Sequence, residues 1–237
     1  MLIPHPVLGK KKSADICRAF AIGAGPYAKG DVFYGVDAHS LPRLRASKNY
    51  WYIDNSYFDV VRGQQFRVTH NAIQVDPGKH ESDGKRFDRL GLKVKPWRFI
   101  EGKYTLFCPQ SPWFMAAVAQ WKGDWLAQQL LTFGGEQLRI RPWNSDKLTI
   151  AESFRKDLAG ARHLITHSSA AAVEALLEGV PVTVARMSAV FGIDPQHDTR
   201  LHAMRVLADN QFTLEEMRSG YAWEKLRGEA TKAVVPP

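Results

Sequence analysis

The sequence predicts an α/β protein whose open, parallel sheets are covered by helices. The clearest evidence is the segment 163–185, which has the pattern of a strand, a Ser-rich loop, a helix and a second strand. Apolar residues recur at helical spacing over 173–177. Gly179 stands where a helix commonly ends, and Pro181 prevents the helix from resuming. Strand and helix patterns alternate over 104–185, which favours the same fold class.

The first hundred residues contain short apolar runs that are typical of strands. We expect strands at 16–22, 31–36 and 50–53. Residues 66–69 and 73–75 are expected to form a short antiparallel pair. The segment 76–89 is polar and rich in turn-forming residues, so an exposed loop is expected there.

A second series of elements begins near Lys103. We expect strands at 104–108 and 138–140 and helices at 113–133 and 148–158, ahead of the strand–helix–strand segment already described. In the first of these helices, Trp121 and Trp125 belong to the bulky apolar face. The tail, 196–230, is expected to be helical and to pack back on the molecule.

The net charge of +8 is concentrated in one part of the chain. Residues 1–103 contain 18 Lys and Arg against 10 Asp and Glu, whereas residues 104–237 contain 14 of each kind. A basic surface attracts anions such as nucleic acid, acidic glycan or anionic lipid, although an ordinary solvated surface explains the charge equally well. The first hundred residues are therefore the candidate region for an anionic partner.

The composition also limits the cellular setting. No apolar run reaches the length of a membrane span, and the N-terminal residues lack the pattern of a signal peptide, so a soluble cytoplasmic protein is expected. Cys17 and Cys108 lie far apart in apolar surroundings. We interpret both as small core residues, since a disulfide or a metal site would need closely placed partners.

Polar residues follow three expected strands of the second part of the chain. They are Gln110 and Ser111, then Arg141, and then His167, Ser168 and Ser169. Because the carboxyl ends of parallel strands meet at one edge, these groups are expected to converge on one ligand. The planar guanidinium of Arg141 suits phosphate oxygens, and Ser169 or Ser168 can cap the following helix. Glu174, farther along that helix, is placed to accept hydrogen bonds from a ribose diol.

These motifs resemble the nucleotide-binding domain of GT-B glycosyltransferases, and most closely the bacterial capsule-polysaccharide type that includes Kdo transferases. The similar features are a strand ending in Gln110, a basic residue before Pro142, a Ser-rich loop, and the run Glu-Ala-Leu-Leu-Glu-Gly-Val-Pro-Val that starts at Glu174. The family's usual His before the proline is replaced by Arg141. This resemblance covers residues 103–195. A compact enzyme with a basic acceptor domain also resembles small phage-type proteins that decorate DNA bases.

The resemblance implies a GT-B-like fold of two Rossmann-like units with parallel sheets and a C-terminal helical tail. The implied organisation is a reduced acceptor domain at 1–102, a nucleotide-sugar-binding domain at 103–195 and a tail at 196–237. Asp54, which follows a strand, is similar to the acidic residue that faces the donor cleft in such enzymes, and it is the candidate general base. The alternative is that Asp54 is a turn residue, because the run Asp-Asn-Ser over 54–56 also favours a turn. No His, Cys and Asp cluster has metal-ligand spacing, and the resemblance implies that no metal is needed, because helix dipoles and basic side chains offset the charge of the leaving phosphate. The nucleotide sugar is expected as a substrate, and no cofactor is expected.

The sequence leaves several functions open. The first is a glycosyltransferase that uses a nucleotide sugar and modifies a hydroxymethylated pyrimidine in phage DNA, for which basic and aromatic residues over 43–67 are suited. The second is a capsule or lipopolysaccharide sugar transferase with a CMP-sugar donor. The third is a non-catalytic module that binds a nucleotide or a nucleic acid. The sequence does not indicate an oligomeric state.

Overall fold

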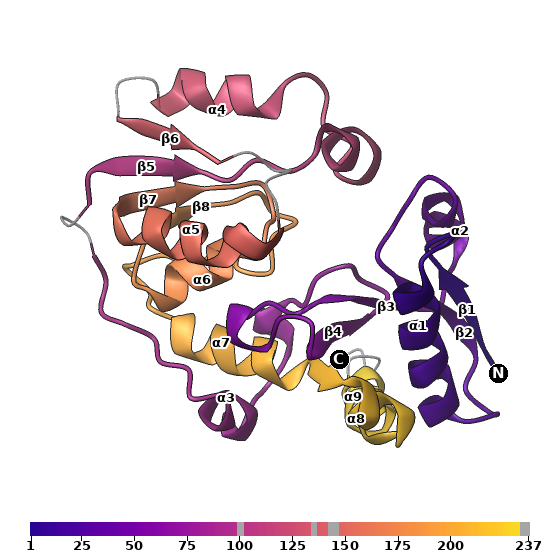
Figure 1. The fold of residues 1–237 in the computed structure, drawn as a ribbon. Coiled ribbons are helices and arrows are strands. Elements are labelled where there is room, and N and C mark those ends of the chain that lie inside the picture. The colour runs from indigo at the N-terminus through magenta and orange to yellow at the C-terminus, as the bar shows by residue number, and fades with distance from the viewer. Residues whose placement is uncertain (99–101, 134–136, 142–146, 233–237) are drawn as a thin grey trace. The chain divides into compact units, whose positions relative to one another are not determined.

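The computed structural model describes residues 1–98, 102–133, 137–141 and 147–232 (Figure 1). The chain divides into two compact units. The first combines residues 1–86 with residues 205–237, and the second comprises residues 87–204. The sequence predicts divisions near 103 and 196. In the structure the second unit begins earlier, at residue 87, and ends later, at residue 204, and the rest of the tail belongs to the first unit. Each unit has its own sheet.

The sheet of the first unit is mixed. Its strands follow one another across the sheet in the order β1 (Leu2–Pro6), β2 (Gly30–Tyr34), β3 (Tyr50–Asn55), β4 (Gln65–His70) and β9 (Gln211–Thr213). The first three strands are parallel, and β4 and β9 are antiparallel to their neighbours. The parallel half has the expected Rossmann-like character. The last strand of this sheet, β9, comes from the far end of the chain.

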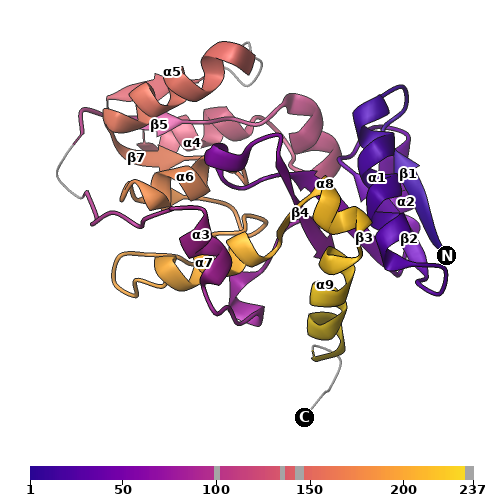
Figure 2. The ribbon, with the colours of Figure 1, turned by 60° about the horizontal axis from the view of Figure 1, so that its bottom comes forward.

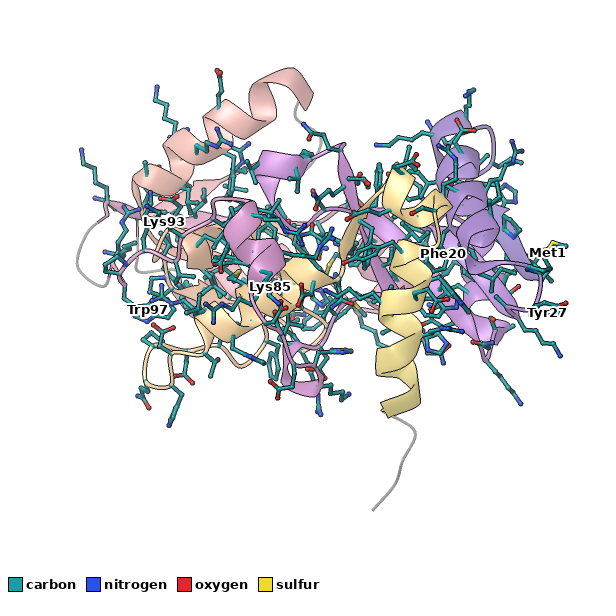
Figure 3. The ribbon with its side chains drawn as sticks, turned by 90° about the horizontal axis from the view of Figure 1, so that it is seen from below. Met1, Phe20, Tyr27, Lys85, Lys93 and Trp97 are labelled. Carbon is teal, nitrogen blue, oxygen red and sulfur yellow. The ribbon has the colours of Figure 1, made fainter. Side chains whose placement is uncertain are left out.

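Helix α1 (Lys11–Ala24) covers one face of this sheet with α8 (Leu214–Arg218) and α9 (Tyr221–Lys232). Figure 2 shows the three helices side by side. Phe20 of α1 is fully buried and contacts Trp51 of β3 and Trp223 of α9. Figure 3 labels Phe20 on this helical face, in contrast to Tyr27, which is 93% exposed in the turn that follows. Aromatic side chains therefore form much of the core of the first unit.

The expected strand at 16–22 is wrong, because these residues belong to α1. Its buried residues Ile16, Cys17, Ala19 and Phe20 are spaced for one face of a helix. The run is almost continuously apolar, so a window of seven residues does not separate a buried strand from half of a helix. The edge strand β1, which is too short and too exposed to carry a strong apolar pattern, has no counterpart in the sequence analysis.

The antiparallel pairing expected for 66–69 is confirmed in direction, but its partner is β3 and not 73–75. The segment 76–89 is only partly an exposed loop. It contains a short 3-10 helix at Pro77–Lys79 and the helix α3 (Lys85–Arg89), in which Arg86 is buried. Arg86 donates to Glu216 at 2.6 Å, and this ion pair fixes the segment to the C-terminal helices of the same unit.

The second unit is an α/β unit with a fully parallel sheet, as predicted. Its strands lie in the order β6 (Leu138–Ile140), β5 (Tyr104–Phe107), β7 (Ala161–Ile165) and β8 (Val182–Thr183). Helix α4 (Trp125–Phe133) packs on the face that carries Phe107 and Ile165. Figure 1 shows α5 (Lys147–Ala159) and α6 (Ala171–Leu177) together over β7. The parallel arrangement brings the carboxyl ends of β5, β6 and β7 to one edge.

The expected stop after α6 is confirmed. Gly179 has φ of 78°, and the amide of Val180 donates to the carbonyl of Ala175, which closes the helix end. A Cβ at Gly179 would lie 1.9 Å from the carbonyl oxygen of Pro96. Glycine is therefore needed here both for the left-handed backbone and for the close approach of the backbone at Pro96.

The single long helix expected at 113–133 is wrong. The structure has a π-helix at Phe114–Val118 and the separate helix α4. Between them Gln120 has φ of 53° and Gly123 has φ of 89°, so the backbone leaves the helical region twice. This interruption leaves an irregular segment between the π-helix and α4.

The tail contains the expected helices, here α7 (Arg200–Asp209), α8 and α9, together with the unexpected strand β9. Both cysteines are buried and unbridged, as predicted. Burial raises the pKa of Cys17 and of Cys108 to about 12, so neither thiol is a reactive thiolate at neutral pH.

Candidate functional site

The polar residues that follow β5 and β7 come together in the second unit. The backbone amide and the hydroxyl of Ser168 both donate to Oε1 of Gln110, each at 3.2 Å. Behind this contact the hydroxyl of Thr166 donates to the carbonyl of Cys108 at 2.6 Å, which holds the two strand ends together. The predicted convergence of Gln110 and Ser168 is therefore present, and it rests on the parallel register of β5 and β7.

His167 lies beneath this contact with only 4% of its surface exposed. Its Nδ1 is 3.2 Å from the hydroxyl of Ser168, and its ring meets the rings of Trp121 and Trp125 edge to face. Burial lowers the pKa of His167 below its ordinary value of 6.5, so the imidazole is neutral at pH 7. A neutral imidazole can hold or accept a proton through a ring nitrogen, but it does not supply a fixed positive charge for phosphate.

Ser169 and Ser111 use their hydroxyls on the local backbone. Ser169 accepts from the amide of Ala171 at 3.2 Å, just before α6, and Ser111 accepts from the amide of Phe114 at 3.1 Å, just before the π-helix. These contacts satisfy amides that have no intrahelical partner. The predicted capping by Ser169 is present one residue upstream of the helix boundary, where Ala170 makes no side-chain cap.

Glu174 is half-buried and lies in the first turn of α6, which begins at Ala171. A carboxylate in the first turn is favoured by the helix dipole. Its position thus has a structural explanation as well as the predicted contact with a ribose.

Arg141 has an acidic partner that no sequence pattern predicts. Its guanidinium forms an ion pair with Asp157 of α5, donates to Ser153 at 3.2 Å and lies over the ring of Phe154. Asp157 also binds Arg139 at 2.6 Å. Pro142, the second residue of the expected basic motif, lies outside the described residues. Phosphate binding by Arg141 would therefore compete with Asp157.

A cavity of about 550 Å³ opens beside Gln110, at the carboxyl end of β5. Its lining includes Gln110, Met115, Trp121, Asp124, Trp125 and Leu126. A largely apolar cavity of this size with a few polar groups is typical of small-molecule sites. Trp121 and Trp125 also contact His167, so one wall of the cavity is continuous with the contact between Gln110 and Ser168.

Asp54 belongs to the first unit, at the end of β3, and faces Arg67 of the antiparallel strand β4. Its Oδ2 accepts from Arg67 at 2.7 Å and from the hydroxyl of Tyr52 at 3.0 Å, and its Oδ1 accepts from the amide of Asn55 at 2.7 Å. The side chain is 26% exposed. Three donors thus fix the orientation of the carboxylate while leaving part of it accessible to solvent.

Within the described ranges no group of three or more His, Cys, Asp or Glu side chains is placed to hold a metal ion. A search of the same residues finds no helix with the length and apolarity needed to cross a membrane.

The two α/β units define a GT-B-like fold. The solved structure of the β Kdo 2,7 transferase KpsC from Thermosulfurimonas dismutans is similar to this chain, with a TM-score of 0.50 and 12% sequence identity. The alignment covers 94% of this chain and 99% of that chain. Neither a protein-family model nor the sequence of a curated protein matches. At this identity the likeness concerns the fold, and it confirms the fold class predicted from the sequence.

Three residues of the site are absent from the sequence-based candidates. Trp121 and Trp125 were assigned to the apolar face of a long helix, and Asp157 carried no pattern of its own. Because Trp121 enters the cavity only through the break at Gln120, periodicity alone does not find it. The two tryptophans near a strand end rich in prolines were the only available signal.

Proposed function

We propose that this protein is a glycosyltransferase that takes its sugar from a nucleotide-sugar donor. The observation that carries the proposal is the cluster of Gln110, His167 and Ser168 beside a 550 Å³ cavity, at the strand-end edge of a GT-B-like unit. Ligands of open α/β sheets bind at this edge. The similarity of the fold to a Kdo transferase supports the same class of reaction.

In this proposal the loop 167–169 binds the phosphates of the donor. Oε1 of Gln110 orients Ser168, and its Nε2, which has no hydrogen-bond partner among the described residues, is the atom that donates to the ligand. Glu174 accepts from the ribose hydroxyls. Arg141 contributes to phosphate binding when the phosphate replaces Asp157, because a guanidinium pairs with either oxyanion in the same planar geometry.

The acceptor hydroxyl must lose a proton as the new glycosidic bond forms, and the bond from the sugar to the nucleotide phosphate breaks. We assign the proton acceptor to Asp54. The carboxylate is held by Arg67 and Tyr52 and so presents a defined geometry. No metal ion is assigned to the reaction, since hydrogen-bond donors and Arg141 offset the charge of the departing phosphate.

Two acceptor classes remain in the proposal. One version has a capsule or lipopolysaccharide acceptor and a CMP-sugar donor, and the sequence motifs over 103–195 that resemble Kdo transferases support it. The excess of basic residues over 1–103 is suited to either an acidic glycan or DNA carrying a hydroxymethylated pyrimidine. Binding of DNA would weaken steeply with salt, and a protein that binds neither duplex nor single-stranded DNA would leave the glycan as the acceptor.

A non-catalytic nucleotide-binding module is the second candidate. It is favoured by the ion pairs of Arg141 with Asp157 and of Asp54 with Arg67, since both proposed active groups already have charged partners. Such a module would bind a nucleotide without transferring a sugar.

The decisive experiment is a thermal-shift screen of the full chain with UDP, GDP, CMP and their sugars, followed by transfer assays with the donors that bind. A glycosyltransferase is expected to bind one nucleotide family, to release its nucleotide in the presence of acceptor, and to keep its activity in a chelator. Arg141→Lys, which keeps the charge but loses the bidentate geometry, should weaken binding. Binding without sugar release from any donor would favour the non-catalytic module. Absence of nucleotide binding would reject both.

A further inference from the structure

The cavity beside Gln110 is built from an unusual stretch of backbone. A π-helix at Phe114–Val118 is followed by Gln120 with φ of 53°, a conformation that residues other than glycine adopt rarely. Both features cost stability and recur at ligand sites. Their consequence here is that Trp121 is turned toward the cavity instead of following the face of a regular helix.

Trp121 brings a second indication of a ligand. Its Nε1 is buried, yet no hydrogen-bond partner is found for it among the described residues. Buried donors are nearly always paired, because an unpaired donor loses its bonds to water without replacement. The Trp121 ring also lines the cavity together with Trp125. A ligand with both an apolar face and hydrogen-bonding groups suits this wall.

The described residues that line the cavity include a negatively charged side chain and no Lys or Arg. The negatively charged residue is Asp124. Oδ1 of Asp124 accepts from the amide of Ala127 at 3.1 Å and so begins α4. Asp124 is exposed, and no hydrogen bond to its Oδ2 is found within the described part of the chain, so this oxygen is open to solvent and to a ligand. A hydroxyl can donate to such an oxygen, whereas a carboxylate on the ligand would be repelled.

We propose that this cavity holds the sugar of the donor, and that it selects a neutral, hydroxyl-rich sugar over a sugar acid. This inference rests on the proposed function, and it excludes the version of that function in which the donor is a CMP-activated sugar acid. The C–H face of a pyranose packs on the indole rings, whose faces are electron-rich. Its rim hydroxyls bind Asp124 and the amide of Gln110. Since Gln110 also contacts Ser168, the sugar and the phosphate that it leaves lie on the two sides of one side chain.

The first test compares binding of nucleotides and nucleotide sugars to the full chain by calorimetry. UDP-glucose and GDP-mannose carry neutral sugars, and CMP-N-acetylneuraminic acid carries a sugar acid. The donor with a neutral sugar should bind at least about tenfold more tightly than its own nucleotide, while the sialic acid donor should gain nothing over CMP. A sugar-acid donor that binds more tightly than every neutral one would overturn the inference.

Two variants connect the selectivity to the cavity. Asp124→Asn keeps a good N-cap for α4 and removes the charge. It should reduce the preference for the neutral sugar about tenfold and leave the affinity for the free nucleotide unchanged. Trp121→Leu should likewise abolish the gain from the sugar. Trp113→Leu is the matched control, because Trp113 is 40% exposed in the same segment and does not line the cavity.

The outcomes separate the inference from the function on which it rests. If Trp121→Leu weakens nucleotide and nucleotide sugar by the same factor, the cavity holds another part of the donor and the inference fails while the proposed function stands. If the sialic acid donor keeps no advantage in wild type but gains one in Asp124→Asn, the inference is supported. If the wild-type chain binds no nucleotide, the proposed function fails and the inference fails with it.

Discussion

Asp157 and Arg141 form a buried ion pair between α5 and the end of β6, with side chains 6% and 11% exposed. Asp157 also binds Arg139, whose side chain is 54% exposed. One carboxylate thus serves two guanidiniums, and only one of these is accessible to solvent. The arrangement makes Asp157 the residue on which the charge balance of this strand end depends.

Asp157→Asn should lower the free energy of unfolding by about 3 kcal/mol, because it removes the carboxylate that pairs with the buried guanidinium of Arg141. Urea unfolding monitored by circular dichroism measures the change. Arg139→Gln is the control, and it should cost about 1 kcal/mol or less, as is usual for an exposed pair. Equal losses in the two variants would show that the pair with Arg141 is not the important one.

The double variant Ser168→Ala/Ser169→Ala should lower stability and nucleotide affinity together. The Ser168 hydroxyl contacts Gln110 and His167, and the Ser169 hydroxyl accepts from the amide of Ala171, so each hydroxyl is worth about 1 kcal/mol in folding. Loss of ligand contacts should weaken binding by a similar amount per residue. Ser188→Ala, at a buried turn elsewhere in the second unit, should affect stability alone. Unchanged nucleotide affinity in the double variant would place the ligand elsewhere.

Stability should depend on pH through His167. Its folded pKa is lowered by burial below the ordinary value of 6.5, so the unfolded state binds more protons as the pH falls below about 6.5. The stabilising effect of a neutral His167 is complete above that pH and is lost as acid favours the unfolded chain. Unfolding free energies of wild type and His167→Gln should therefore converge between pH 7.5 and 5.5. A difference independent of pH would contradict this behaviour. His70, whose pKa burial also lowers, is common to both proteins and cancels in the comparison.

Asp54→Asn should reduce kcat by about 10²-fold or more, with donor affinity retained, if the carboxylate accepts the proton of the acceptor. The variant also weakens the pair with buried Arg67, so the rate must be normalised to folded protein. Tyr52→Phe removes a neighbouring hydrogen bond and keeps the carboxylate. It should therefore retain most of the activity. Full transfer activity in Asp54→Asn would remove the catalytic assignment.

Glu174→Gln should raise the KM for the donor more than it lowers kcat, because a contact with the ribose is made in the ground state and in the transition state alike. Steady-state kinetics with the donor identified by the thermal-shift screen measures both constants. A large fall in kcat at unchanged KM would indicate instead that Glu174 acts on the reacting atoms.

The sequence predicts the second unit well because its signals are local and mutually consistent. The Ser-rich loop, the apolar face of α6 and the stop at Gly179 each lie within one short segment, and the structure confirms them. In the first unit, the run at 16–22 predicts a strand because nearly every residue in it is apolar, whereas the structure has the helix α1 there. Its helical character depends on what it packs against, and Phe20 contacts residues as distant as Trp223.

The candidate site was predictable only where it depends on topology. Parallel strands bring Gln110 and Ser168 together whatever the details of packing, so their contact follows from the order of elements. The partner of Arg141 and the position of Trp121 depend on a side chain of α5 and on one left-handed residue, Gln120, respectively. Neither leaves a periodic pattern in the sequence.

Strand β9 joins the sheet of the first unit through β4, although about 140 residues of chain separate the two. During synthesis, strands β1 to β4 leave the ribosome long before Phe212 is available to pair with Phe66. The hydrogen-bonding edge of β4 is then unpaired, and the faces that α8 and α9 will cover are still open. The second unit, whose strands are contiguous in the chain, can complete its sheet in that interval. The order of translation therefore favours the unit with the candidate site as the first to mature, with the N-terminal sheet completed last.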